Sequence, residues 1–271
     1  MLAGQAQGQH QLKGRAETKP FVMGQVDQIP SAVRGEARIL NIYLPEGYDQ
    51  DVAARYPVIY LLDGSATEDF VHISGIVQFL TMIGRMPKTI IVGIANVDRK
   101  RDFTFPTTVE KDRKDFPTTG GSEKFMSFLE KELLPFIDRK YRTSPDRTII
   151  GQSLGGLFAT EILLKKPGLF TDYIIVSPSL WWNKESLLLL APKAVAGYEG
   201  KAVRVCISVG KEGEQMEVDA KRLSDILRVG NKKCLTSWFV YMPDENHLTI
   251  LHNCVYRSLE ILYPLTPDGR K

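Results

Sequence analysis

Cysteine is scarce in this sequence, and its spacing argues against two classes of site. Only three cysteines occur among 271 residues, and no two of them form a Cys-x-x-Cys pair. An odd number without such spacing argues against a disulfide framework and against a structural zinc site. Each cysteine has apolar neighbours, so we expect free, buried thiols at Cys206, Cys234 and Cys254.

Long apolar segments and concentrated basic charge are also missing. No run approaches the roughly 20 apolar residues needed to span a bilayer, so we expect no membrane span. The formal net charge is only +3, and no dense Lys/Arg stripe with interleaved aromatic residues occurs. Nucleic-acid binding is therefore not favoured. Hydrophobic residues make up 43% of the chain and charged residues 25%, which is typical of a globular protein.

The N-terminal region lacks the pattern of an intact signal peptide. Residues 1–14 are polar and rich in Gln and Gly, with no basic segment followed by an apolar run. We expect residues 1–32 to form a flexible leader with a possible edge strand. The protein is then either cytoplasmic or exported after removal of a signal peptide, and the sequence does not distinguish the two.

Strand-like and helix-like segments alternate along the rest of the chain. The strand-like segments are short apolar runs such as Pro57–Leu62 and Thr89–Ile94, whereas Ser122–Arg139 repeats apolar residues with the period of one helical face. The stretch 96–121 is charged and shows no clean periodicity. This alternation predicts an α/β fold, with a mostly parallel sheet between helices, in one domain spanning residues 33–271. We further expect strands over 38–44, 147–150, 173–176, 203–209 and 237–241, and helices over 70–83, 154–165, 219–229 and 247–263.

The most informative motif is Gly151-Gln152-Ser153-Leu154-Gly155-Gly156, which matches Gly-x-Ser-x-Gly and joins a strand-like to a helix-like segment. Such a turn projects the serine hydroxyl at the carboxyl edge of the sheet, where the next helix begins and its N–H groups favour an oxyanion. This setting predicts the nucleophile elbow of an α/β-hydrolase, with Ser153 as nucleophile and the Leu154 N–H as one oxyanion donor. Topology places the second donor in the turn after Leu62, at the N–H of Ser65.

A serine hydroxyl is a weak nucleophile and needs a base. In the α/β-hydrolase fold the chain order is serine, acid, histidine. Among four histidines, His247 lies in the loop after the last expected strand, so we predict that it is the base. The acid is expected in the loop after the preceding strand, where Glu212 comes first and Glu214 and Glu217 are alternatives. A Ser-His dyad without an acid also stays open.

Several segments beyond the elbow resemble the esterase D family of α/β-hydrolases, in family order over most of the chain from about Val33 onward. That family includes enterobactin and salmochelin esterases, S-formylglutathione hydrolases, feruloyl and acetyl-xylan esterases and mycolyltransferases, and the sequence looks closest to its siderophore-esterase-like branch. The resemblance implies an ester hydrolase with no metal and no organic cofactor, and it supports Ser65 and Leu154 as oxyanion donors. The matching segments are Ile42–Tyr48, Tyr60–Gly64, Asn96–Asp102, Gly151–Gly156, Ser177–Trp182 and Glu245–His247.

Two pairs of side chains are candidates for contact with the substrate. Arg99 and Arg101 would suit an acidic or catecholate substrate, although arginines in a charged loop are commonly solvated. Trp181 and Trp182 would line an acyl or alcohol pocket; alternatively, one of them packs in the core and the other caps it.

Together these features predict a serine carboxylic-ester hydrolase that forms an acyl-enzyme on Ser153 and acts on a small-molecule ester. Two alternatives use the same site: an acyltransferase and a siderophore trilactone esterase. A non-catalytic binding domain is least favoured, because Ser153 and His247 occur in the required order. The sequence does not indicate an oligomeric state.

Overall fold

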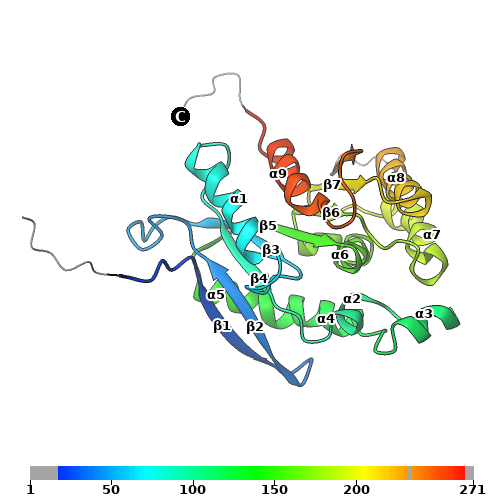
Figure 1. Ribbon diagram of the computed structural model, residues 1–271, viewed down its shortest axis with the longest axis horizontal. Coiled ribbons are helices and arrows are strands. Elements are labelled where there is room, and N and C mark those ends of the chain that lie inside the picture. The colour runs from blue at the N-terminus through cyan, green and yellow to red at the C-terminus, as the bar shows by residue number, and fades with distance from the viewer. Residues whose placement is uncertain (1–17, 231–233, 266–271) are drawn as a thin grey trace, which may run out of the picture.

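The fold is built on one eight-stranded sheet (Figure 1). The computed structural model describes residues 18–230 and 234–265, and within them the strand order is β1-β2-β4-β3-β5-β6-β7-β8. Strand β2 runs antiparallel to β1 and β4, whereas the strands from β4 to β8 in this order all run parallel. The strands are β1 (Gln25–Ser31), β2 (Glu36–Tyr43), β3 (Tyr56–Leu61), β4 (Ile90–Ile94), β5 (Thr143–Gln152), β6 (Asp172–Val176), β7 (Val203–Gly210) and β8 (Leu235–Met242).

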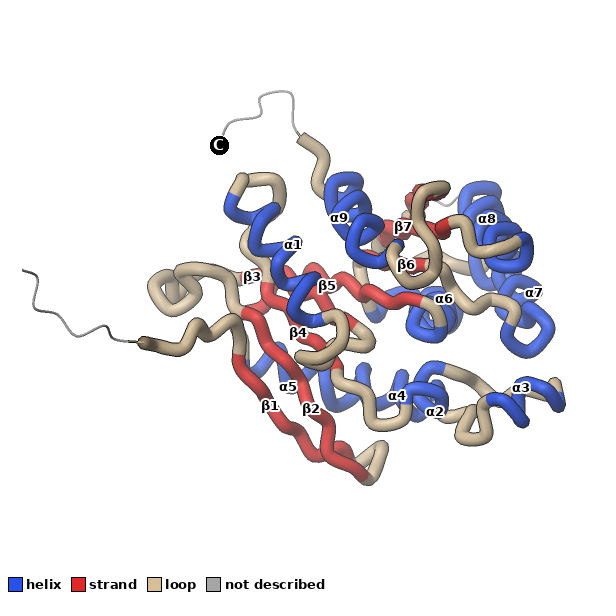
Figure 2. The backbone as a smooth tube through the Cα atoms, in the orientation of Figure 1, coloured by secondary structure: helices blue, strands red, loops and turns tan. Residues whose placement is uncertain are grey.

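Helices cover both faces of this sheet, as Figures 1 and 2 show. Helices α1 and α9 share a core with one face, and α4 to α8 share a second core with the other. Within the described ranges, no helix combines the length and the apolar content that crossing a bilayer requires. The helices are α1 (Phe70–Met82), α2 (Arg99–Phe103), α3 (Glu110–Asp115), α4 (Ser122–Phe128), α5 (Leu134–Lys140), α6 (Leu154–Lys165), α7 (Trp182–Ala196), α8 (Glu214–Val229) and α9 (Ile250–Leu262), with a π-helical turn, Leu129–Leu133, joining α4 to α5.

The central strands follow from their composition. Every residue of β4 and β6 is buried, because helices cover both faces of a parallel sheet and leave no solvent side for polar residues. Strand β1 instead alternates, with Asp27, Ile29 and Ser31 buried and the residues between them exposed. It forms one edge of the sheet, within the segment 1–32 that we expected to hold a leader and a possible edge strand. Residues 1–17 of that leader lie outside the described residues.

The structure differs from the expected elements mainly at the helices, although β5 also begins four residues before its expected start, at Thr143. Helix α7 was not predicted, because its apolar run Leu187–Leu190 and its internal proline hide any helical period. Helices α2 and α3 lie within the aperiodic stretch 96–121 and are too short to show a period. Helix α8 begins at Glu214, five residues before the expected start, and its first turn carries acidic residues that suit a helix N-terminus. Helix α9 begins at Ile250 instead of residue 247.

The three thiols are free. Cys206 and Cys254 are buried as expected, and burial raises their pKa values to about 12 and about 11. Because the thiolate is the reactive form, these two side chains are inert packing groups. Cys234 is only partly buried, so the prediction of burial was wrong for this residue: it precedes the edge strand β8, where fewer elements cover the chain.

Candidate active site

Three loops meet at the carboxyl edge of the parallel strands. They follow β5, β7 and β8, which end at Gln152, Gly210 and Met242. Parallel strands present their carboxyl ends at one edge of a sheet, which is where ligands bind in open α/β sheets. Hydrogen bonds join these segments directly. Gln152 Nε2 donates to the carbonyl oxygen of His247 (2.5 Å), and the N–H of Lys211 donates to the carbonyl oxygen of Glu245 (2.7 Å).

Ser153 occupies the sharp turn between β5 and α6. Its backbone has φ 59° and ψ −118°, a conformation that costs a non-glycine residue roughly 1–3 kcal/mol. The turn is held by the Ser153 N–H, which donates to the carbonyl oxygen of Val176 (3.0 Å). A Cβ atom at Gly151 would lie 2.4 Å from the carbonyl oxygen of Gly155, so glycine is required there. Leu154 is the first residue of α6, and the first N–H groups of a helix have no partner within it.

Glu212 lies against His247. Its Oε2 atom is 2.5 Å from His247 Nδ1, and its Oε1 accepts hydrogen bonds from Ser177 Oγ (2.5 Å) and from the N–H of Gly210 (3.0 Å). The carboxylate side chain is only 2% exposed, whereas that of His247 is 41% exposed. Burial by itself raises the pKa of Glu212, but the hydrogen bonds from His247, Ser177 and Gly210 outweigh it and hold the pKa below its usual range. The group therefore stays ionised.

The other two candidate acids lie elsewhere. Glu214 is exposed in the first turn of α8. Glu217 Oε1 accepts hydrogen bonds from the N–H groups of Glu212 (3.0 Å) and Gly213 (3.1 Å), so it supports the backbone of the loop between β7 and α8. Of the three glutamates, only Glu212 is brought to His247.

Ser153 and His247 line two adjoining hollows, of about 400 and 510 Å³. Within the described chain no hydrogen bond joins their side chains, and Ser153 Oγ instead lies 3.4 Å from Ser179 Oγ. Catalytic hydrogen bonds are often long in a free enzyme and tighten when substrate binds. With Nδ1 held by Glu212, the His247 nitrogen available for proton transfer is Nε2.

The turn that carries Ser65 is packed tightly against the neighbouring strand. A Cβ atom at Gly64 would lie 2.4 Å from the Cα of Gly93, so the two backbones touch. The Ser65 N–H donates to Glu68 Oε2 at 3.3 Å, and Glu68 also lines the hollow of about 400 Å³. The proposed oxyanion donor therefore already faces an anionic acceptor, supplied by the protein itself.

Comparison with known proteins identifies the family to which the chain belongs. Residues 31–236, well over half of the chain, match the family described as Putative esterase. The chain belongs to this esterase family. It is 32% identical over 261 residues to the ferri-bacillibactin esterase BesA of Bacillus subtilis (strain 168), covering 87% of this chain and 88% of the relative.

Solved structures show the same fold. An IroE-like serine hydrolase from Shewanella oneidensis superposes with a TM-score of 0.81 and 31% identity, over 89% of this esterase and 80% of the other chain. The BES protein from Bacillus cereus superposes with a TM-score of 0.81 and 28% identity, over 92% of this esterase and 99% of the other chain. The fold is the α/β-hydrolase fold predicted from the elbow, and the protein is a carboxylic-ester hydrolase.

Arg99 and Arg101 of the esterase have different surroundings. Arg99 lines the hollow of about 400 Å³ and donates two hydrogen bonds to Asp63, from Nε to Oδ1 (2.6 Å) and from Nη2 to Oδ2 (2.9 Å). Arg101 instead pairs with Glu36 (2.6 Å) and Asp102 (2.8 Å), in a buried ionic cluster that also holds two further arginines. The structure brings Arg99 to Ser153 and does not bring Arg101 there.

The two tryptophans also separate. Trp181 lines the hollow of about 510 Å³ beside Ser153 and His247. Trp182 is fully buried, and its Nε1–H donates to the carbonyl oxygen of Phe105 (2.9 Å). Trp182 therefore packs in the core, as the alternative expectation had it for one of the pair. Trp181 packs against the core and also lines the hollow, so it combines the two expectations.

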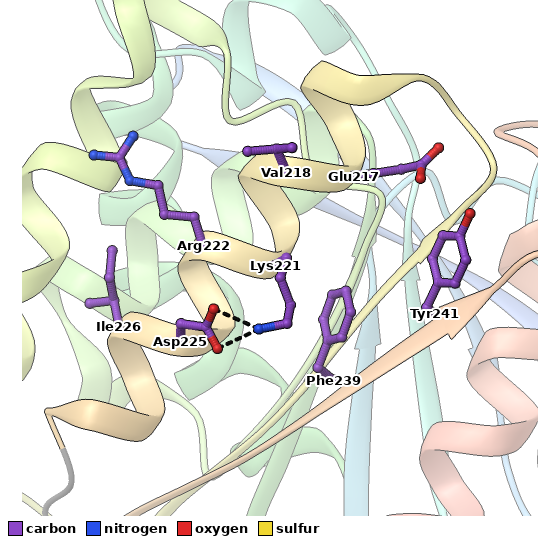
Figure 3. A pocket seen from close by; sticks show the side chains of 8 residues that line it. All are labelled: Glu217, Val218, Lys221, Arg222, Asp225, Ile226, Phe239 and Tyr241. Carbon is purple, nitrogen blue, oxygen red and sulfur yellow. Dashed lines mark hydrogen bonds and ion pairs between the residues drawn. The ribbon is translucent and has the colours of Figure 1, made fainter.

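The esterase has a larger hollow, of about 640 Å³, away from Ser153 (Figure 3). It lies between α8 and the edge strand β8, where Val218 and Ile226 of the helix and Phe239 and Tyr241 of the strand form its apolar lining. Charged groups of α8 at this hollow, Lys221 and Asp225, pair with each other at 2.6 Å. No serine or histidine lines it, so it does not compete with the Ser153 site for the ester chemistry.

Sequence reasoning missed two residues that position the site. Ser177 fixes the second oxygen of Glu212, and Gln152 ties the elbow to the histidine loop. Both lie inside segments that carry the family resemblance, Gly151–Gly156 and Ser177–Trp182. Their presence in those segments was the available signal, but their roles depend on contacts between loops that are distant in the chain.

Proposed function

We propose that Ser153, His247 and Glu212 form the catalytic triad of this esterase. The observation that carries the proposal is the 2.5 Å hydrogen bond between His247 Nδ1 and a buried, ionised carboxylate, beside a serine held on a strained elbow. A carboxylate on Nδ1 fixes the tautomer that leaves Nε2 as a proton acceptor and stabilises the imidazolium that forms. This arrangement favours a triad over a Ser-His dyad.

The reaction proceeds in two acyl-transfer steps. His247 Nε2 takes the Ser153 proton as Oγ attacks the ester carbonyl carbon, and the carbonyl oxygen becomes an oxyanion. His247 then gives its proton to the leaving alkoxide, and the C–O bond of the ester breaks to leave an acyl-enzyme. A water molecule deprotonated by His247 attacks the acyl carbon, and the acid leaves as Ser153 regains its proton.

The N–H groups of Leu154 and Ser65 stabilise both oxyanions. Leu154 supplies the first N–H of α6, where the helix dipole adds to the effect. The Ser65 N–H faces Glu68 Oε2 in the free enzyme, so substrate binding displaces that carboxylate from the donor.

We propose esters of siderophores as the substrate class. BesA, a relative that this chain matches along most of both lengths, is named a ferri-bacillibactin esterase. Both hollows are lined by Ser153 and His247, and together they leave room for the acyl and the alcohol part of a large ester. The hollow of about 510 Å³ presents Lys211 and the aromatic face of Trp181, which suits an aryl-bearing ligand. In the other hollow Arg99 is paired with Asp63, and Glu68 and Asp69 add two further carboxylates.

The test combines a substrate panel with two serine variants. A ferric trilactone siderophore, a feruloyl sugar ester and an acetyl sugar ester are compared by kcat/KM, with p-nitrophenyl acetate as the reference ester. Ser153→Ala should lose at least about 10³-fold in kcat on every ester, because it removes the nucleophile. Ser179→Ala, which changes the nearest serine hydroxyl, is the matched control and should retain activity.

The two parts of the proposal fail separately. Wild-type turnover of p-nitrophenyl acetate by Ser153→Ala would overturn the triad. A trilactone kcat/KM no higher than those of the two sugar esters, with Ser153→Ala inactive on all of them, would overturn only the substrate class.

A further inference from the structure

Two histidines from separate helices meet beside the hollow of about 400 Å³ that contains Ser153. His72 lies on α1 and His252 on α9, the two helices that cover the same face of the sheet (Figure 1). Their Nδ1 atoms face each other at 3.3 Å, and their ring centroids are 5.4 Å apart with the ring planes tilted by 35°. The His72 side chain is 34% exposed and His252 is also exposed, so a solute reaches both rings.

The separation of the two nitrogens matches that of two ligands on one metal ion. A tetrahedral zinc ion with Zn–N bonds of about 2.0–2.1 Å holds its ligand nitrogens about 3.3 Å apart. Imidazole nitrogen is a preferred ligand of zinc, copper and nickel. An ordinary hydrogen bond between two neutral rings would also bring the Nδ1 atoms together, so the distance alone does not decide between the two.

A carboxylate supports one of the rings from its far side. Asp69 Oδ1 lies 3.2 Å from His72 Nε2. Metal-binding histidines commonly donate the N–H of their second nitrogen to a carboxylate, which fixes the tautomer and makes the other nitrogen a better ligand. With the proton of His72 on Nε2, its Nδ1 lone pair is directed at His252.

We propose that His72 and His252 form a two-histidine binding site for a divalent transition-metal ion of the zinc type. The ion is bound by the two Nδ1 atoms and keeps water at its remaining positions, since within residues 18–230 and 234–265 no group of three or more His, Cys, Asp or Glu side chains is arranged to hold a metal. Asp69 belongs to the second coordination shell through its contact with His72.

The position of the site gives it two consequences. The ion joins α1 to α9, so it binds the folded chain in preference to the unfolded one and raises Tm. Asp69 also lines the hollow that contains Ser153, so the ion lies at the rim of the catalytic hollow. The site is independent of the ester chemistry, because neither histidine contacts the proposed triad.

The experiment is a Zn²⁺ titration of the full chain without an affinity tag, followed by isothermal calorimetry at pH 7.5, with Co²⁺ absorption spectra as a second readout. Wild type should bind one ion at micromolar concentration. His72→Ala and His252→Ala should each weaken binding at least tenfold and abolish the Co²⁺ spectrum of nitrogen coordination. His72 is partly exposed and His252 is exposed, and esterase activity on p-nitrophenyl acetate reports that the variants are folded.

The control is His247→Ala, which removes the histidine of the proposed triad and should leave the high-affinity Zn²⁺ site intact. The proposal is overturned if wild type takes up no Zn²⁺, which would leave the 3.3 Å contact as a hydrogen bond. It is equally overturned if binding survives in both His72→Ala and His252→Ala, or is lost only in His247→Ala.

Discussion

Replacing Glu212 with Gln tests how the proposed base is oriented. Two donors, Ser177 Oγ and the N–H of Gly210, converge on Oε1, whereas His247 Nδ1 alone contacts Oε2. A glutamine of the same shape satisfies most donors with its oxygen at the Oε1 position, which turns its NH₂ group toward His247. Nδ1 must then accept a hydrogen bond, so the imidazole proton moves to Nε2, the atom that has to accept the proton of Ser153.

The expected loss is large and confined to catalysis. The wrong tautomer and the missing negative charge together should lower kcat by about 10³-fold, which corresponds to about 4 kcal/mol of transition-state stabilisation. KM for p-nitrophenyl acetate should change by less than about threefold, because Glu212 does not contact the substrate. Steady-state kinetics at pH 8 measure both constants, and Tm reports that the fold is intact.

The matched control is Glu214→Gln, which changes the neighbouring carboxylate on the surface of α8 and should keep kcat within about twofold of wild type. A role for Glu212 in orienting His247 is refuted if Glu212→Gln retains more than a tenth of the wild-type kcat, or if kcat falls as far in Glu214→Gln as in Glu212→Gln.

Three further predictions concern stability and the substrate pocket. Gly151→Ala places a methyl group 2.4 Å from a backbone oxygen, so it should lower Tm and reduce the free energy of unfolding by about 1–3 kcal/mol. Gly75→Ala, whose methyl group would meet nothing within 4 Å, should not lower Tm; equal Tm values for the two variants would contradict the prediction. Trp182→Ala should lower the free energy of unfolding in urea by about 3–5 kcal/mol, because the side chain is fully buried. Trp181→Ala should raise KM and cost clearly less stability, because the side chain is only partly buried; the reverse pattern would exchange their roles. Burial raises the pKa of Glu212, but its hydrogen bonds lower the pKa overall, so the ionised carboxylate stabilises the fold above the ordinary glutamate pKa of about 4.3 and this stabilisation is lost as pH falls through the lower folded pKa. The difference in unfolding free energy between wild type and Glu212→Gln should therefore shrink between pH 7 and pH 3. A difference that stays constant over this range would contradict the prediction.

The sheet and the elbow were predictable because their signals are local. The buried runs Pro57–Leu62 and Thr89–Ile94 have no polar alternation, as two-sided burial requires, and the glycines around Ser153 stand where the turn brings backbones together. The position of His247 beside Ser153 was predictable from chain order in the fold. These features depend on neighbours in sequence and on one known topology.

The acid and the substrate-facing residues depend on contacts between distant segments, so composition could not separate them. Glu212 and Glu214 are two residues apart in one polar stretch of the sequence, but only Glu212 contacts the loop that follows β8. Arg99 and Arg101 lie in one short helix, and their side chains reach different partners. Likewise, Trp181 and Trp182 are adjacent, and the turn before α7 sends one into the core.

The proposed mechanism requires that Ser153 carries the acyl group. It is tested most directly by reacting the protein with a fluorophosphonate and locating the adduct by peptide mass spectrometry, because such a reagent phosphonylates an activated serine hydroxyl. We expect one adduct per chain, on Ser153, formed much more slowly in His247→Ala and absent in Ser153→Ala. Stoichiometric labelling at Ser179 or at any other serine, with Ser153 unmodified, would contradict it.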